Sequence, residues 1–411
     1  MTRAARGAPE RPLPDLAATF FRWSFARGLW ARGYWLVASV YLVIVADLSP
    51  AQLVLVGAGA ALVVLVAEVP AGVFADTVSR KWSLVLAHLI SGAGMAMTGL
   101  VTGFPALVAS QALWALGWAF ADGADVAWIT DELDRPHLID RVLAARARWE
   151  LLGAAGGLVG FGAIAWATGL GPAIVLSGTG MAGLGLVVAW RFPEHRFVPA
   201  PVYRRWRAAR SVLRGGLRLA RRDREIRLLL IAWVLVNGSG EGYGRLVEKR
   251  LVTLGVARSG HVIVWFAALG LATLALGAVV LRVVEARIHG AGVARGMYVL
   301  CCTVGVGGMV LFAHAPDARY GMVAVLLVSG VSHPGAVVRA VGEIWVNRRT
   351  TSDVRATVHS LLSQAEHVGE VAFGLVLAWL AQATTVTVSL TGAAIVLAAA
   401  GAIVTRASAS G

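Results

Sequence analysis

Long apolar runs, separated by short segments rich in arginine, constrain this chain more than any other feature of its sequence. A transmembrane helix needs about 20 mostly apolar residues. Charged residues make up only 15% of the chain, against about 25% in a typical soluble domain. The sequence therefore predicts an all-α membrane protein with twelve transmembrane helices, centred near Val40, Val63, Gly92, Trp114, Val159, Met181, Leu235, Gly270, Gly305, Leu326, Gly374 and Val396.

The positive residues predict the orientation of these helices. The formal net charge is +14, and basic residues gather before the first run, after every second run and at the end of the chain. The connections near Ser49, Thr102 and Gly169 carry none. Cytoplasmic loops of membrane proteins are enriched in Lys and Arg, so both termini are expected in the cytoplasm. The connection after the seventh run breaks this pattern, because it holds Arg245, Lys249, Arg250 and Arg258.

A strongly basic chain is also typical of nucleic-acid-binding proteins. Here the arginines lie between apolar runs, so we interpret them as facing anionic lipids of the inner leaflet. We expect membrane lipids as partners, no nucleic acid, a monomer, and a multi-pass protein of the cell membrane (plasma or inner). Cys301 and Cys302 are adjacent within an apolar run, and such a pair indicates neither a disulfide framework nor a metal site.

The chain divides into two similar halves. We predict a cytoplasmic N-terminal segment at residues 1–26, a six-helix bundle at 27–194, a cytoplasmic linker at 195–225 and a second six-helix bundle at 226–411. Within the linker, apolar residues recur at three- and four-residue steps from Trp206 to Ala220, with arginines on the other faces. This pattern favours an amphipathic helix on the inner leaflet; the alternative is a solvated linker.

One motif stands between the second and third runs and reads Gly72-Val-Phe-Ala-Asp76-Thr-Val-Ser-Arg80-Lys81. Gly72 would allow close helix approach, Asp76 would place an anion at a helix end, and Arg80 and Lys81 would supply orientation charge and an ionic latch. The motif resembles the loop signature of the major facilitator superfamily. The simpler interpretation is an ordinary basic loop on the inner side, in which Asp125 or Asp131 pairs with Arg80.

The resemblance implies two six-helix bundles, each made of inverted three-helix repeats, that rock about a central cavity. It also implies that Asp76 meets the start of the eleventh helix, here residues 352–357, which include Arg355. Gly72, Asp76, Arg80, Lys81 and Arg355 are the implied conformational-switch residues. Similar features of a drug-efflux-like branch are Glu68-Val-Pro70-Ala-Gly72 and the acidic tail that ends in Asp131 and Glu132.

Ionisable residues within the apolar runs are further candidates, because each costs about 2.5–3.5 kcal/mol in a membrane and so tends to face a partner or a watery cavity. Asp122 and Asp125 are three residues apart, a spacing that would share one helix face; they would either support the motif loop or carry protons. Glu241 and Arg245 would form a static pair, a gate or a substrate contact, in a glycine-rich stretch that favours a broken or bent helix. All coupling or substrate candidates are Glu68, Asp122, Asp125, Glu241, Arg245, Glu366 and Glu370.

The eleventh helix offers five polar groups, most of which share one stripe: His359, Ser363, Glu366, His367 and Glu370. The stripe would serve proton coupling or substrate binding, or it would form hydrogen bonds between the bundles. His88 and His333 stand alone in apolar runs and are interpreted as packing residues.

These features favour a secondary active transporter that moves a small, lipophilic molecule by proton-coupled efflux, as an antiporter. The alternatives are an uptake carrier for a polar metabolite and a non-transporting membrane enzyme or scaffold on the same fold. The sequence holds no G-x-x-x-x-G-K-[ST], G-x-S-x-G or H-E-x-x-H pattern. We therefore expect no ATP drive, no catalytic residue, no cofactor and no metal.

Overall fold

The computed structural model describes residues 13–256, 261–287, 291–332, 338, 341 and 352–406. Its first half is a succession of helices joined by short turns. They are α1 (Leu13–Ile44), α2 (Pro50–Thr77), α3 (Arg80–Thr98), α4 (Phe104–Ala121), α5 (Ala124–Leu133), α6 (Pro136–Thr168) and α7 (Leu170–Arg191).

The helix α8 (Val202–Arg222) links this half to the second. The second half contains α9 (Arg224–Thr253), α10 (Val262–Arg287), α11 (Ala291–Ala313), α12 (Ala318–Val325), the π-helical turn η2 (Leu326–Ser332), α14 (Ser352–Ala383) and α15 (Val386–Thr405). The predicted lone histidine His333 lies outside the described residues.

Local sequence explains where several helices begin. Ser49 and Gln52 form a reciprocal capping box at the start of α2, which has Pro50 in its first turn. The Ser79 hydroxyl accepts a hydrogen bond from the backbone N–H of Trp82 at the start of α3. Gly123 has φ +73°, a left-handed conformation that glycine adopts without strain, and it separates α4 from α5. The motif loop thus joins the end of α2 to the start of α3, and the acidic tail with Asp131 and Glu132 forms the last turn of α5.

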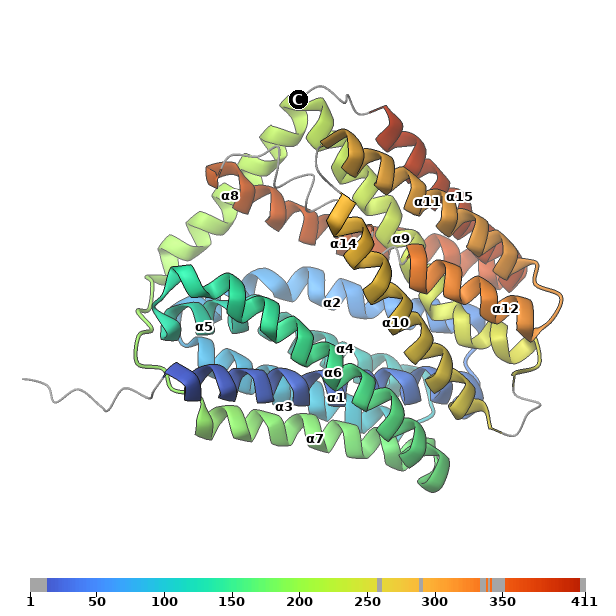
Figure 1. The fold of residues 1–411 in the computed structure, drawn as a ribbon, viewed down its shortest axis with the longest axis horizontal. Coiled ribbons are helices and arrows are strands. Elements are labelled where there is room, and N and C mark those ends of the chain that lie inside the picture. Colours follow the sequence, from blue (N-terminus) through green and yellow to red (C-terminus); the bar gives the residue numbers. More distant parts are fainter. Residues whose placement is uncertain are drawn as a thin grey trace, which may run out of the picture.

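Each half is held together by close helix packing (Figure 1). In the first half α1 packs on α6 and α7, and α3 packs on α4 and α7. In the second half α9 packs on α14 and α15. Gly153 of α6 faces the Phe25 carbonyl of α1, and Gly369 of α14 faces the Val234 carbonyl of α9, so closely that a Cβ at either position would overlap that oxygen. Small residues permit this approach in membrane helices, and the two contacts occupy equivalent places in the two halves.

A seam joins the halves. It is formed mainly by α2 against α14 and α9, and by α6 against α10. Ala58 of α2 lies beside Gly374 of α14, while Gly162 and Gly270 bring α6 close to α10. The structure therefore places α2 and α14, which are about 300 residues apart in sequence, side by side.

Seven helices in the described part of the chain are long and apolar enough to cross a membrane. They include α2, α6, α7, α10, α11 and α15, and the stretch Phe104–Leu133 that combines α4 and α5. Charged side chains interrupt the apolar runs of α1, α9 and α14, and α3 begins with Arg80 and Lys81 and contains the polar His88. These four helices fall outside that set. The chain is a multi-pass membrane protein, and the number of twelve crossings stays a prediction.

A broken helix in the glycine-rich stretch of the seventh run, one of the two predicted forms, is wrong. The helix α9 is continuous from Arg224 to Thr253. Two of its glycines serve packing, because Gly238 faces Phe373 and Gly242 faces Leu377, both on α14.

Candidate functional site at the seam between the two halves

The motif loop is fastened to α5 through Arg80. The guanidinium of Arg80 donates to the Ala127 carbonyl at 2.8 Å and forms an ion pair with Asp131. Its Nη2 also lies 3.6 Å from Asp76 Oδ1. Of the two carboxylates that the sequence offered to Arg80, Asp131 is the partner. The predicted close approach at Gly72 is wrong, because a Cβ built there would meet nothing within 4 Å.

The same loop is also bound to the connector that leads to α8. Asp76 Oδ2 lies 3.4 Å from Arg205 Nη1, and its carbonyl accepts from Ala200 N–H at 3.0 Å. Glu194 accepts from the Ser79 hydroxyl at 2.6 Å and from the Lys81 N–H at 2.9 Å. These contacts connect the end of α2 and the start of α3 to the segment between the halves.

The implied contact of Asp76 with the start of α14 is not among the ion pairs of the described residues, where Asp76 pairs with Arg80 and Arg205. The side chain of Arg355 lies outside the described part of the structure. The switch role of these residues therefore stays a prediction.

Asp122 and Asp125 do not share a helix face, as their spacing had predicted, because Gly123 breaks the helix between them. Asp122 is exposed at the end of α4. Asp125 is buried, with a side chain only 4% exposed, and pairs with Arg27 of α1 at 3.1 Å and Arg146 of α6 at 2.6 Å. Asp125 thus ties three helices of the first half together.

Glu68 crosses the seam. Its carboxylate accepts hydrogen bonds from the Ser363 hydroxyl, at 2.8 Å, and from the Gln364 side-chain amide, both on α14. Asp122 interacts electrostatically with Glu68 from the end of α4. A membrane-embedded carboxylate of one half is therefore held by the polar stripe of the other.

The predicted pair of Glu241 and Arg245 is present, with Arg245 Nε 2.7 Å from Glu241 Oε1. It faces the first half directly. A Cβ at Gly57 of α2 would overlap the Glu241 carboxylate, and the guanidinium of Arg245 lies 5.5 Å from the ring centre of Trp35 on α1. A cation over an indole face at this distance is attracted to it.

The two acids of the predicted stripe on α14 are connected to this pair, Glu370 directly and Glu366 through His367. Glu370 Oε2 lies 2.9 Å from His367 Nδ1, and Glu370 also interacts electrostatically with Arg245. Glu366 interacts with His367 in the same way. Acids, a histidine and an arginine from α2, α9 and α14 thus form one connected polar region at the seam.

Sequence reasoning missed one member of this region. Glu248 of α9 interacts electrostatically with Arg245 of the same helix and with Arg32 of α1. Its spacing from Glu241 and Arg245, at seven and three residues, places it on the same helix face, which is the signal that could have found it. Lys249 Nζ, 3.1 Å from Asp47 Oδ1, joins the halves near the turn between α1 and α2.

No family model matches the sequence, and no curated protein matches it significantly. Solved structures do resemble it. The nucleoside transporter NupG superposes with a TM-score of 0.75 at 15% identity, over 95% of this chain and 99% of that one. A bacterial homologue of the human lysosomal transporter Spinster, in its inward-facing and occupied conformation, superposes with a TM-score of 0.70 at 15% identity. The superposition covers 98% of this chain and 97% of that one. A D-xylose–proton symporter superposes with a TM-score of 0.69 at 15% identity, over 95% of this chain and 98% of that one.

The chain has the major facilitator fold. The superposition covers both halves of the chain. In the major facilitator fold, substrate and coupling-ion sites lie near the bilayer midplane between the repeats. The polar region around Glu68, Arg245 and Glu370 lies at the seam between the two halves, which makes it the candidate functional site.

Proposed function

We propose that this protein is a secondary active transporter that moves a small molecule by alternating access. Its twelve helices would form two bundles, residues 27–194 and 226–411, with the linker 195–225 and both termini in the cytoplasm of a cell-membrane monomer. The observation that carries the proposal is the row of ionisable side chains along the seam of a major facilitator fold. Such groups are expensive in a membrane and mark transport pathways.

Proton coupling is assigned to the carboxylates of the seam. Glu370 with His367, and Glu68 with Ser363 and Gln364, are hydrogen-bonded in the present arrangement. Protonation of Glu68 would remove the negative charge that Ser363 and Gln364 stabilise by hydrogen bonds. Protonation of Glu370 would remove the negative charge that attracts Arg245. The free energy of the seam would then change with protonation, which is what coupling requires.

The motif loop would couple protonation at the seam to a rearrangement of contacts at the cytoplasmic side. Asp76, Arg80 and Lys81 connect the ends of α2 and α3 to α5 and to the connector, and Gly72 precedes them by one turn on α2. In the opposite state, Asp76 would release Arg205 and meet the start of α14 near Arg355.

Efflux of a lipophilic compound is the first candidate direction, on the resemblance to the drug-efflux-like branch. Uptake of a polar metabolite is the second. It is favoured by the polar character of the seam, where Glu68, Glu241, Arg245, Glu248 and Glu370 offer many hydrogen-bonding groups, and by the nucleoside and D-xylose carriers among the compared structures.

Proteoliposomes with a pH-sensitive dye inside test the proposal. Ethidium, uridine and D-xylose are added in turn, and the proton flux that each solute drives is recorded. We expect flux with one class of solute, lost in Glu370→Gln and retained in Asp140→Asn, a control at an exposed acid. Solute turnover without movement across the membrane would support the enzyme alternative instead. Flux that is equal in empty liposomes and in both variants would refute transport by this site.

A further inference from the structure

The helix α8 carries an unusually basic face. It contains eight arginines and no acidic residue. Arg207, Arg210, Arg214 and Arg218 follow one another at steps of three and four, so they share one side of the helix. All four are exposed.

Within the described residues, no acidic side chain pairs with the positive charges of these four arginines. In the part of the chain that the structure describes, none of the four forms an ion pair, and the only hydrogen bond of their side chains joins Arg218 Nε to the Arg214 carbonyl at 3.4 Å. Like charges four residues apart destabilise a helix. An external anion would relieve that repulsion.

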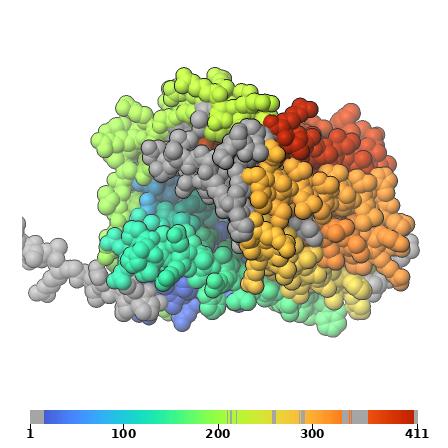
Figure 2. All heavy atoms as spheres, turned by 45° about the horizontal axis from the view of Figure 1, so that its top comes forward, coloured from blue at the N-terminus to red at the C-terminus, as the bar shows by residue number. Residues whose placement is uncertain are grey.

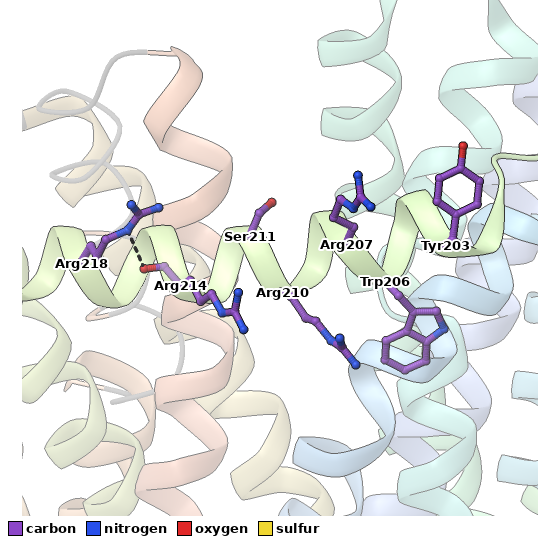
Figure 3. Close-up of a pocket in the computed structure, with 7 residues that line it drawn as sticks. All are labelled: Tyr203, Trp206, Arg207, Arg210, Ser211, Arg214 and Arg218. Atoms are coloured by element: carbon purple, nitrogen blue, oxygen red, sulfur yellow. Dashed lines mark hydrogen bonds between the residues drawn. The ribbon is translucent and has the colours of Figure 1, made fainter.

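A hollow of about 860 Å³ runs along this face (Figure 3). The four arginines line it together with Tyr203, Trp206 and Ser211. Arginine guanidinium and a hydroxyl are donors that suit phosphate oxygens, and an exposed indole and phenol are the side chains that favour the membrane–water interface. The donors and the aromatic groups thus occur on one surface.

The opposite side of α8 is attached to both halves. Arg205 pairs with Asp76 at the end of α2, and Gly216 faces Leu361 of α14 so closely that a Cβ would overlap that side chain. Figure 2 shows α8 at the surface between the first half and the second. The helix α8 therefore contacts both halves through Arg205 and Gly216 and exposes the four arginines of its other side.

We propose that Arg207, Arg210, Arg214 and Arg218 bind the phosphate of an anionic phospholipid headgroup of the inner leaflet, and that this contact holds α8 across the end of the α2–α14 seam. A lipid is favoured over a soluble anion because α8 joins membrane helices at both ends and exposes Trp206 and Leu217, at 38% and 50% of their surface, beside the arginines. Headgroup phosphate would satisfy the charges while acyl chains cover these apolar side chains.

Native mass spectrometry of the full chain, from micelles that contain phosphatidylglycerol or phosphatidylcholine, tests the inference. The variant has Arg207, Arg210, Arg214 and Arg218 replaced by Gln. The control has Arg135, Arg141, Arg148 and Arg406 replaced by Gln, which removes the same charge from exposed positions elsewhere. Each basic residue near an anionic surface adds to binding, so we expect at least about tenfold weaker retention of phosphatidylglycerol in the variant only.

Three results would overturn the inference. The first is equal retention of phosphatidylglycerol by wild type and variant. The second is a loss of phosphatidylglycerol retention in the control as large as that in the variant. The third is that wild type retains phosphatidylcholine as well as phosphatidylglycerol. Displacement of the lipid by millimolar inorganic phosphate would assign the face to a soluble anion and overturn the lipid source. Melting temperatures measured without added lipid check folding. If the variant melts below wild type, the arginines are replaced by Lys, which keeps the charge, and retention is expected to return.

Discussion

At the scale of single residues, the buried ion pairs and the exposed ones play different parts. Asp125 is almost fully buried between two arginines of different helices, whereas Asp134 and its partner Arg196 are exposed at 65% and 42%. Removing one partner of a buried pair leaves an uncompensated charge and costs about 3–5 kcal/mol. An exposed pair contributes about 0–1 kcal/mol.

We therefore predict that Asp125→Asn lowers the free energy of unfolding by about 3 kcal/mol, with a clear fall in melting temperature in detergent. Asp134→Asn is the matched control and should melt within a degree or two of wild type, on the order of a surface pair. Similar melting of the two variants would mean that Arg27 and Arg146 find other partners.

A second residue-scale prediction concerns Glu68. Glu68→Gln keeps the size of the side chain and a carbonyl acceptor for Ser363 but removes the charge. If Glu68 titrates during transport, the variant should fold like wild type and lose solute-driven proton flux, while solute exchange at constant pH survives. Loss of both activities would assign Glu68 to the static contact between α2 and α14.

At the scale of helices, glycine positions decide which faces can meet. Gly153 of α6 lies against the backbone of α1, whereas a Cβ at Gly160, two turns further along the same helix, would have nothing within 4 Å. Close backbone approach is how membrane helices gain packing energy.

Gly153→Leu should separate α1 from α6, lower the melting temperature by many degrees and reduce the yield of folded protein. Gly160→Leu adds the same side chain where a Cβ has nothing nearby, so the melting temperature and the yield of folded protein should stay close to wild type. Size-exclusion chromatography and melting in one detergent compare them, and comparable damage from both would show that leucine harms α6 for another reason.

At the scale of the whole molecule, the two halves touch at separate levels. Asp47 and Lys249 meet beside the turn between α1 and α2, and Glu68 meets Ser363 deeper along α2. Alternating access requires some of these contacts to open.

We predict that a short bis-maleimide linker between Asp47→Cys and Lys249→Cys, in a background with Cys301→Ser and Cys302→Ser, abolishes flux in proteoliposomes. Each single cysteine variant, treated in the same way, should retain flux because nothing joins the halves. Full flux in the linked protein, with cross-linking verified by mass, would contradict movement at that contact.

Much of the fold could be predicted because its causes are local. Several of its features depend only on residues within a few helical turns of one another. They are the length of the apolar runs, the placement of the arginines, the Ser49 capping box and the four-residue spacing of Glu241 and Arg245. The candidate site was predicted in its residue types, and Glu68, Glu241, Arg245 and Glu370 do come together. Glu248 was missed because the seventh run was expected to end before it, and Asp122 was misplaced because a single left-handed glycine turned the chain.

The sequence by itself determined that this chain is a helical membrane protein with a charged motif loop and acids within its spans, because hydropathy and helical periodicity act along the chain. Only the tertiary structure decided the partners: Asp131 for Arg80, Arg205 for Asp76, and Ser363 for Glu68, 295 residues away. The physical reason is that such contacts depend on which helix faces meet. Spacing along one helix can mark a face of that helix, but it does not name the helix that will pack against it.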